Sequence, residues 1–367
     1  MIRIALDIHT IGQQATGNET YISGLLNAFK KHPQTDLHFT YYHSRSLKDK
    51  KWPGTYKKLS PQSPFLRIPL STPYALYRDN IDVSHFQYFH PLLSPCPAVV
   101  TIHDLSFEHH PEFFSPLMRN ALRYLAPIMA KRAAHIITVS KATKQDLIEK
   151  YKLPSDKISV IYNSTSSSFH NQYKHSLLIE RIARFNLPRP FVVSVGNLGP
   201  RKNQHRLIRC FSNLVENGDI DFDLVLVGQP VYKANAILDE IKKTKAKGRI
   251  HVTGFVNQDE LVALYNLAMF SIYPSLFEGF GLPILESMAC GTPVITSNCS
   301  CMPEIAKDAA LLINPRDDDD LSSAMLELST NSALREKLVT SGLQRTSDFS
   351  WERAADRTIN VYRNITS

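Results

Sequence analysis

Short apolar runs of strand length alternate with longer segments of helical periodicity along the whole chain. Such alternation predicts βαβ units, which build parallel sheets covered by helices. The predicted strands lie near residues 2–8, 37–41, 83–86, 98–102, 135–139 and 158–161, and then near 191–195, 223–227, 250–252, 270–273, 293–296 and 310–313. The pattern therefore predicts an α/β protein with two parallel-sheet units, divided close to residues 163–185.

Two segments depart from this alternation. Residues 42–80 are rich in Pro, Ser, Lys and Tyr with weak periodicity, so we expect an irregular, mobile excursion there. Residues 351–365 carry apolar side chains at helical spacing, which predicts a helix that needs a neighbour to cover its apolar face. We therefore divide the chain into residues 1–170, residues 171–349 and a final segment of residues 350–367.

The composition is that of a soluble globular protein, and 367 residues suffice for two domains of ordinary size. No run of about eighteen apolar residues is present to span a membrane, and the first residues lack the apolar stretch of a signal peptide, so we expect a cytoplasmic location. The five cysteines have no ligand partners at metal spacing, and they predict neither a disulfide framework nor a zinc site.

The net charge of +8 comes from the first half of the chain. Residues 1–165 hold 20 Lys and Arg against 12 Asp and Glu, whereas residues 166–367 hold 22 of each. Part of the excess lies in Lys48–Lys58, where basic residues flank Trp52 and Tyr56. This patch could rest peripherally on an anionic membrane at its inner face, which attracts each Lys or Arg by about 1 kcal/mol, grip an acidic acceptor, or stay a solvated loop. No nucleic-acid partner is expected, because no binding motif accompanies the charge.

The segment Glu278–Glu286 sets two carboxylates around a glycine-flanked turn that leads into a predicted helix. Gly279 and Gly281 allow the backbone to approach a ligand closely, and Pro283 suits the first turn of the helix. The exposed amides of a helix start favour an anion such as phosphate. The two glutamates can accept hydrogen bonds from hydroxyl pairs on two sugars, although capping and solvation would also account for them.

A second glycine-containing loop, Gly196–Asn203, follows a predicted strand and contains Arg201 and Lys202. At the carboxyl end of a parallel strand, such a loop is a place for a diphosphate. Together with the two glutamates it indicates a nucleotide sugar as the ligand. Four aspartates at 317–320 precede an amphipathic run, and we assign them to helix capping rather than to a metal. No metal ion or other cofactor is expected.

Two features of the first half are further candidates for ligand binding. Gly17 lies between the first predicted strand and a predicted helix, where a glycine allows close approach of a ligand, or serves as an ordinary turn residue. His103 directly follows the strand at residues 98–102, at the edge where open α/β sheets bind ligands. A histidine there can hydrogen-bond a sugar hydroxyl or a developing charge, or simply a neighbouring backbone group.

In this order the motifs resemble the retaining glycosyltransferases of family 4, which have the GT-B fold of two facing Rossmann-like domains. The matching pieces extend over nearly the whole chain, and they are the early glycine loop, Thr101–Asp104, Thr138–Lys141, Val160–Asn163, Gly196–Asn203, Gly254–Val256, Glu278–Glu286 and Phe349–Glu352. The resemblance implies that residues 1–170 bind the acceptor, that residues 171–349 bind the donor, and that the last helix crosses back onto the first domain.

The resemblance also implies roles for single residues. Glu278 would contact the donor sugar, Glu286 the ribose, and Lys202 the departing diphosphate. His103 would reach the donor sugar from the first domain. The remaining donor-binding positions would be Gly17, Gly254, Phe255 and Val256, with the backbone amides of Gly279, Phe280, Gly281 and Leu282. Many family members carry an arginine soon after the loop glycine, where this chain has Asn197. Either Arg201 takes over that charge, or Lys202 and backbone amides hold the diphosphate alone.

The implied reaction is metal-independent transfer of a hexose, with retention, from a nucleoside diphosphate sugar to a hydroxyl of a polysaccharide or lipid-linked glycan. The stretch His103–Phe107, followed by Pro111–Phe113, resembles mannosyltransferases of bacterial surface-polysaccharide assembly, which favours GDP-mannose. UDP-glucose, UDP-N-acetylglucosamine and dTDP-rhamnose stay open as donors. Two other functions remain possible: a GT-B-like sugar-nucleotide epimerase, and a catalytically silent partner subunit that binds a donor without turnover.

Overall fold

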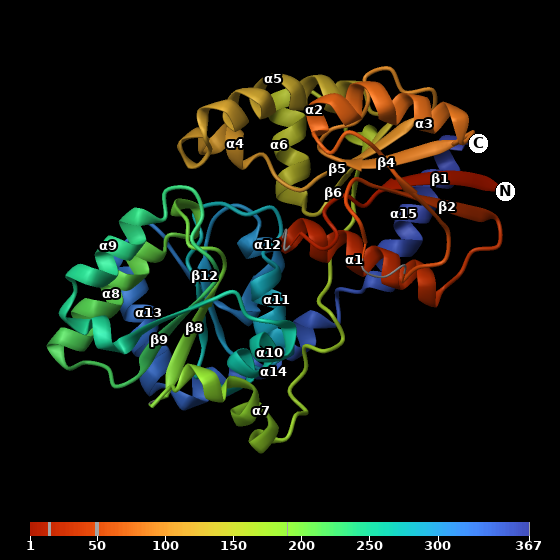
Figure 1. The fold of residues 1–367 in the computed structure, drawn as a ribbon. Helices are drawn as coiled ribbons and strands as arrows, with labels where there is room; N and C mark the ends of the chain where they lie inside the picture. The colour runs from red at the N-terminus through yellow and green to blue at the C-terminus, as the bar shows by residue number, and fades with distance from the viewer. Residues whose placement is uncertain (14–15, 48–50, 189, 367) are drawn as a thin grey trace. The chain divides into compact units, whose positions relative to one another are not determined.

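The computed structural model describes residues 1–13, 16–47, 51–188 and 190–366 (Figure 1). The chain forms two compact units. The first unit comprises Met1–His109, Pro116–Ser164 and Ser350–Ser367, and the second comprises His110–Ser115 and Thr165–Phe349. Each unit has its own parallel sheet and its own core, which confirms the predicted α/β class.

The sheet of the first unit has seven strands in the order β3-β2-β1-β4-β5-β6-β7, and every pairing is parallel. Its strands are β1 (Ile2–Asp7), β2 (Leu37–His43), β3 (Thr55–Lys58), β4 (Val83–Gln87), β5 (Ala98–Ile102), β6 (His135–Thr138) and β7 (Ile158–Val160). Because all strands run the same way, their carboxyl ends meet at one edge.

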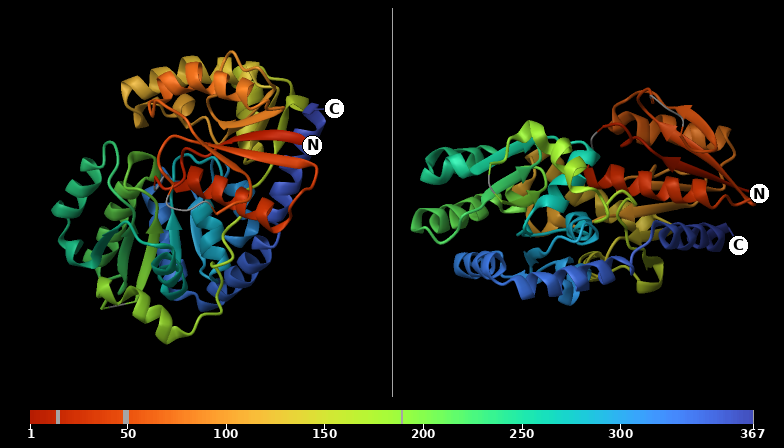
Figure 2. Two further views of the ribbon diagram at one scale, coloured as in Figure 1. Left: turned by 45° about the vertical axis from the view of Figure 1, so that its right-hand side comes forward. Right: turned by 90° about the horizontal axis from the view of Figure 1, so that it is seen from below.

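Helices cover both faces of this sheet. They are α1 (Thr16–Lys31), α2 (Pro64–Leu66), α3 (Thr72–Arg78), α4 (Ser106–His109), α5 (Pro116–Arg132), α6 (Lys141–Tyr151) and α15 (Trp351–Thr366), with a π-helical turn at Arg67–Ser71 between α2 and α3. Helices α1 and α15 pack together below the sheet in Figure 1, whereas α3 and α5 lie above it. The two ends of the chain come close to each other in this unit (Figure 2).

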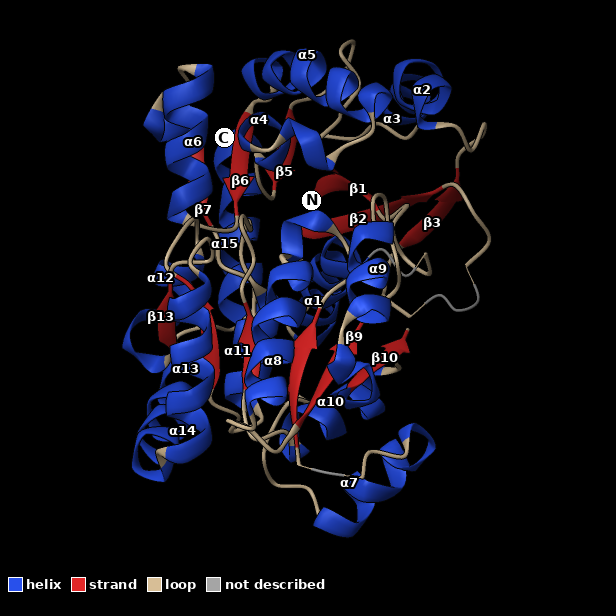
Figure 3. Ribbon diagram, turned by 90° about the vertical axis from the view of Figure 1, so that its left-hand side faces the viewer, coloured by secondary structure: helices blue, strands red, loops and turns tan. Residues whose placement is uncertain are grey.

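The second sheet has six parallel strands in the order β10-β9-β8-β11-β12-β13. Its strands are β8 (Phe191–Val195), β9 (Asp223–Val227), β10 (Ile250–Gly254), β11 (Ser271–Tyr273), β12 (Val294–Ser297) and β13 (Leu311–Ile313). Its helices are α7 (His175–Ile182), α8 (Gln204–Asn217), α9 (Asn235–Lys243), α10 (Gln258–Leu267), α11 (Leu282–Ala289), α12 (Met302–Ala306), α13 (Asp318–Thr330) and α14 (Ser332–Thr346). Helix α8 packs with α9 and α13, and α11 packs with α10 and α14 (Figure 3).

The last helix, α15, completes the core of the first unit. Trp351, Ile359 and Tyr362 are buried among residues of β1, α1 and β4. The Tyr362 hydroxyl lies 2.6 Å from Nδ1 of His85, and Nε2 of His85 lies 2.7 Å from Oγ1 of Thr101. Burial lowers the pKa of His85 to about 3, so this link is made by a neutral imidazole.

The expectation of an irregular excursion over residues 42–80 is wrong for the described part of that segment. It contains β3, paired with β2, and helix α3. Trp52 is buried, and its indole N–H donates to Oδ1 of Asn27 at 2.8 Å. The predicted surface patch Lys48–Lys58 therefore turns its tryptophan inward, while its residues 48–50 lie outside the described residues.

The border between the units falls at residues 164 and 165, earlier than the predicted 170. Phe169 accounts for the shift, because its ring packs against Tyr265 of α10 at 6.2 Å, inside the second core. The short stretch His110–Ser115 also belongs to the second unit. There the ring centre of His110 lies 6.0 Å from that of Phe277. Within the described ranges, no helix is both long and apolar enough to cross a bilayer.

Candidate active site

The loop after β8 positions a lysine at the carboxyl edge of the second sheet. Gly196 has φ 146°, and a Cβ atom there would lie 3.0 Å from Cε of Lys202. A glycine is therefore needed both for the backbone and for the path of the lysine. Gln204 closes the loop, since its Nε2 donates to the Gly196 carbonyl at 3.0 Å and its Oε1 accepts from the Gly199 N–H at 3.3 Å.

Two cations of this loop bind one carboxylate. Nζ of Lys202 lies 2.6 Å from Oε1 of Glu278, and Nη1 of Arg201 lies 2.5 Å from Oε2. Arg201 also donates to the Phe277 carbonyl at 3.0 Å. The structure thus brings together three residues that the sequence placed in two separate motifs, and it positions Arg201 beside Lys202 despite Asn197 in the place of the family arginine.

Charge pairing overrides the effect of burial at Glu278. Its side chain is 7% exposed, and burial alone would raise the pKa of the carboxyl. Arg201 and Lys202 outweigh that effect and hold the pKa at about 2. Glu278 is therefore ionised at neutral pH, and the cluster retains an excess of one positive charge that favours an anionic ligand.

Tyr273 and Ser300 complete the surroundings of this cluster, and the sequence analysis missed both. Nζ of Lys202 donates to the Tyr273 hydroxyl at 2.6 Å, and burial raises the pKa of that phenol, which stays neutral. The Ser300 hydroxyl donates to the Glu278 carbonyl at 2.6 Å and fixes the backbone there. Tyr273 ends β11, which pairs with β8, so its place at the same sheet edge was a usable signal.

Helix α11 begins after Gly281, and in its first turn Pro283 has no N–H while the Ile284 N–H donates to the Gly281 carbonyl at 3.0 Å. Gly281 has φ 89°, a conformation that favours glycine, and it offers no side-chain cap. Pro283 lies in the first turn, as predicted. The Phe280 ring is buried and lies 5.8 Å from that of Phe349, and Leu282 is buried as well. These two side chains belong to the core, so only backbone groups at 279–282 are left to serve the predicted contacts to a ligand.

Glu286 lies on α11 and is half-buried. Its Oε2 accepts from the Tyr265 hydroxyl at 3.2 Å. Burial raises the pKa of this carboxyl to about 7, although Tyr265 and Lys202 oppose the rise. The two glutamates of one motif therefore differ in protonation near neutral pH, because Glu278 has two cations in contact and Glu286 has a phenol.

The other residues of this unit that were predicted to bind the donor differ in their exposure and in their contacts. Gly254 ends β10 with φ 68°, and its carbonyl accepts from the Gly228 N–H at 3.0 Å. Phe255 is 51% exposed, whereas Val256 is buried in the core near Tyr265, so its side chain is not available to a base. Oδ1 of Asn197 accepts from the backbone N–H of Gln229 at 3.3 Å, and this residue thus ties the loops after β8 and β9 together.

His103 and Gly17 belong to the first unit. His103 is buried, its Nε2 lies 2.8 Å from Oε1 of Gln87, and burial lowers its pKa to about 4. At neutral pH it is therefore an uncharged hydrogen-bonding group. Gly17 does not lie between β1 and a helix as predicted but inside the first turn of α1, and among the described residues no atom beyond its own helical turn lies within 4 Å of an added Cβ.

A second charged group at the carboxyl edge of the first sheet escaped the sequence analysis. Asp7 ends β1, and its Oδ2 lies 2.9 Å from Nδ1 of His9. Although burial opposes both changes, the pairing lowers the pKa of Asp7 and raises that of His9. Arg67 is buried and acts electrostatically on both residues. His9 directly follows the first predicted strand, and this position could have pointed to the pair from the sequence.

The aspartates at 317–320 cap a helix, as predicted. Oδ1 of Asp317 accepts from the backbone N–H groups of Asp319 at 3.0 Å and of Asp320 at 3.2 Å, at the start of α13. Among the residues that the structure describes, no group of three His, Cys, Asp or Glu side chains is arranged to hold a metal ion.

Two family models match the chain in succession. Residues 20–168 match the model described as Glycosyltransferase Family 4, and residues 178–345 match the model described as Glycosyl transferases group 1. The chain resembles O-antigen chain mannosyltransferase B of Escherichia coli, with 30% identity over 72% of this chain and 70% of that protein. It also resembles O-antigen chain mannosyltransferase RfbU of Salmonella typhimurium, with 31% identity over 62% of this chain and 59% of that protein.

Solved structures show the same fold at low sequence identity. Sucrose-phosphate synthase from Thermosynechococcus elongatus matches with a TM-score of 0.79 and 20% identity, over 100% of this chain and 99% of that one. Anabaena Alr3699/HepE, solved in complex with UDP-glucose, matches with a TM-score of 0.79 and 15% identity, over 99% of this chain and 100% of that one. With its two parallel-sheet units, its Arg201–Lys202–Glu278 cluster and these relatives, the chain belongs to the family 4 glycosyltransferases of GT-B fold.

Proposed function

We propose that this glycosyltransferase moves mannose from GDP-mannose to a hydroxyl of a polysaccharide or lipid-linked glycan, with retention at the anomeric carbon. The observation that carries the proposal is the pairing of Arg201 and Lys202 with Glu278 beside the uncapped start of α11. The choice of mannose rests on the mannosyltransferase relatives.

The donor would bind at the carboxyl edge of the second sheet. Its diphosphate would take the charge of Lys202, already positioned by Tyr273, together with the amides at the start of α11. Ionised Glu278 would accept hydrogen bonds from sugar hydroxyls, and Glu286 from the ribose. Exposed Phe255, next to Gly254, offers a surface for the base. The predicted contact of His103 with the donor sugar remains a prediction, since that residue belongs to the other unit.

In the transfer step, an acceptor hydroxyl oxygen forms a bond to the anomeric carbon while the bond from that carbon to the diphosphate oxygen breaks. The acceptor proton passes to the departing phosphate on the same face of the sugar. Lys202 stabilises the negative charge that develops on this leaving group, an electrostatic contribution of a kind that often dominates catalysis. Charge neutralisation by Lys202 and Arg201 predicts that EDTA leaves the rate unchanged.

Product analysis tests this proposal. The protein is incubated separately with GDP-mannose, UDP-glucose, UDP-N-acetylglucosamine and dTDP-rhamnose, each with a panel of lipid-linked saccharides, and the products are examined by NMR. We expect free GDP and a new mannoside with the donor's anomeric configuration. An isomerised nucleotide sugar would instead identify an epimerase, and the absence of turnover with every donor would favour a silent partner subunit.

A further inference from the structure

Helix α5 carries an apolar stripe on the side that faces away from its own sheet. Leu122, Ala126, Met129 and Ala130 form its buried face. On the opposite side Leu117 is 74% exposed, Tyr124 67% and Ile128 45%. A solvated helix carries polar residues at such positions. The only charged residues of α5 are basic, namely Arg119, Arg123, Lys131 and Arg132.

A second apolar stripe lies on the same face of the first unit. Leu66, Leu70, Tyr74 and Tyr77 follow one another at helical spacing from α2 through the π-helical turn into α3, and each is more than half exposed. Figures 1 and 3 both place α3 and α5 over the same face of the sheet. Leu93, 80% exposed, adjoins α5, because Arg132 donates to the neighbouring Leu92 carbonyl at 3.4 Å.

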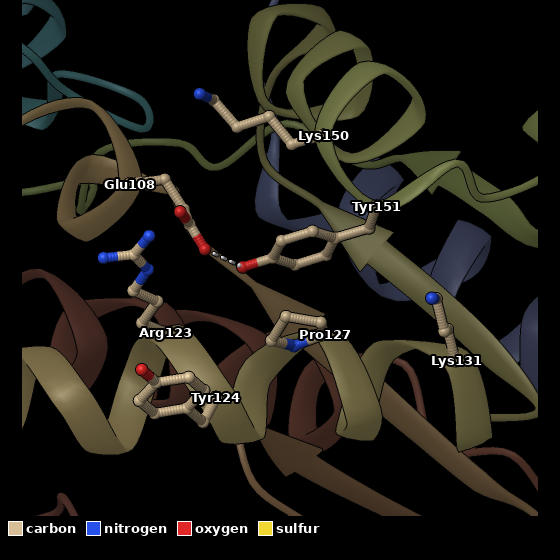
Figure 4. A pocket seen from close by; sticks show the side chains of 7 residues that line it. All are labelled: Glu108, Arg123, Tyr124, Pro127, Lys131, Lys150 and Tyr151. Atoms are coloured by element: carbon tan, nitrogen blue, oxygen red, sulfur yellow. Dashed lines mark hydrogen bonds between the residues drawn. The ribbon is translucent and has the colours of Figure 1, made fainter.

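A basic hollow of about 390 Å³ lies beside the stripe of α5, against α4 and α6 (Figure 4). Three cations line it, namely Arg123, Lys131 and Lys150. None of the three forms a salt bridge to a carboxylate in the part of the chain that the structure describes. One wall is closed by Glu108, which accepts from the Tyr151 hydroxyl at 3.1 Å. Tyr124 belongs both to the hollow and to the apolar stripe.

We propose that this face of the first unit, formed by α5, by the stripe from α2 to α3 and by the basic hollow, docks on an anionic lipid bilayer. The apolar side chains would enter the interface between headgroups and acyl chains, and Arg123, Lys131 and Lys150 would hold lipid phosphates. This assignment moves the predicted membrane contact from Lys48–Lys58, whose Trp52 is buried, to a surface where aromatic and basic side chains are exposed together.

Charge and geometry favour a bilayer over a second copy of this chain. An apolar stripe flanked by Lys and Arg, with aromatic residues at its edge, is the pattern of helices that lie in a membrane interface. If two copies met through α5, two helices whose charged residues are all basic would come together, and their cations would repel each other. Anionic lipid headgroups supply the opposite charge, and each nearby cation adds about 1 kcal/mol to binding.

Sedimentation with vesicles tests the proposal. The full chain is mixed with phosphatidylcholine vesicles that contain or lack phosphatidylglycerol, without donor or acceptor. Wild type should sediment with the anionic vesicles. Arg123→Gln/Lys131→Gln/Lys150→Gln should lower that partition coefficient on the order of 100-fold, because three cations contribute. Leu117→Ser/Tyr124→Ser/Ile128→Ser should remove binding to the anionic vesicles.

Two variants of the second unit serve as matched controls. Lys242→Gln/Lys243→Gln/Lys247→Gln removes the same charge, and Leu177→Ser/Ile179→Ser removes exposed apolar side chains. Both should bind vesicles like wild type. Equal losses in test and control variants, absence of vesicle binding by wild type, or a dimer that only the α5 variants dissociate would each overturn the proposal.

The inference rests on the proposed function only in assuming that a lipid-linked acceptor lies in a membrane. GDP binding by the same variants, which should be unchanged, separates failure of docking from failure of the donor site.

Discussion

At the scale of single residues, Glu278 holds two cations that would otherwise repel each other. Glu278→Gln should lower the free energy of unfolding at pH 7 by on the order of 2 kcal/mol, less than for a fully buried pair, because Arg201 and Lys202 keep contact with water. Urea denaturation measures this change. Asp36→Asn, which breaks the exposed pair with Arg363, should leave the free energy of unfolding close to that of wild type. Equal effects of the two substitutions would contradict the structural role of Glu278.

Glu286 should make stability depend on pH in the opposite sense to an ordinary paired carboxylate. Burial raises its pKa from 4.5 to about 7, so the protonated carboxyl stabilises the fold below pH 4.5, and this contribution is lost as the pH rises through 7. Glu286→Gln, which cannot ionise, should melt close to wild type at pH 5 and above it at pH 8. A difference in melting temperature that stays constant between these pH values would show that the carboxyl is not held protonated.

The sequence predicted the charged members of the candidate site better than its neutral ones. Lys202 and Glu278 stand in motifs whose spacing is visible, and the structure joins them. Tyr273 and Ser300 are hydroxyl residues without such a pattern, and only the fold brings them to the cluster. For Val256, the family motif gives the position of the chain but not the direction of the side chain, which the core determines.

At the scale of elements, all twelve predicted strands are present, and among the described residues β3 is the one strand that was missed. Its sequence, Thr-Tyr-Lys-Lys, lacks the apolar character of the other strands because it lies at the edge of the sheet. The π-helical turn before α3, Arg-Ile-Pro-Leu-Ser, contains a proline, which argues against a helix in the sequence. Both failures fall in the segment whose composition most resembles a loop.

Docking of α15 can be tested through one glycine of α1. A Cβ atom on Gly24 would lie 2.2 Å from Cε2 of Trp351, so Gly24→Ala should displace the tryptophan and cost about 1–3 kcal/mol, as overpacking does. Gly248→Ala, where an added Cβ meets no atom within 4 Å, is the control. Urea unfolding should separate the two. If Gly24→Ala were as stable as wild type, α15 would not be held where the structure places it.

Gly17, also on α1, tests ligand approach rather than packing. In the part of the chain that the structure describes, no atom beyond its own helical turn lies within 4 Å of an added Cβ, so Gly17→Ala should melt like wild type. If a donor approaches this backbone as the family resemblance implies, the Kd for GDP-mannose should rise, on the order of tenfold for about 1.4 kcal/mol of lost contact. Calorimetric titration measures the Kd. An unchanged value would assign Gly17 to the helix alone.

At the scale of the whole molecule, the division of charge matches the proposed division of tasks between the two halves of the chain. The first half carries the whole excess of +8, whereas the second half is neutral overall and holds the candidate donor site. The sequence located this asymmetry, and the membrane contact that it offered at Lys48–Lys58 stays a prediction. Burial of Trp52 and exposure of the α5 stripe follow from how each helix and strand packs on its sheet, which composition does not reveal.

The central claim is that Lys202 and Glu286 form part of a nucleotide-sugar site, and titration calorimetry with GDP tests it most directly. Wild type should bind GDP, and Lys202→Met and Glu286→Gln should each weaken binding on the order of 10- to 100-fold, as expected for one charge-assisted hydrogen bond. Lys247→Met, an exposed lysine of the same unit, should bind like wild type. Equal affinity of all four proteins, or no GDP binding by wild type, would contradict the assignment of the donor site.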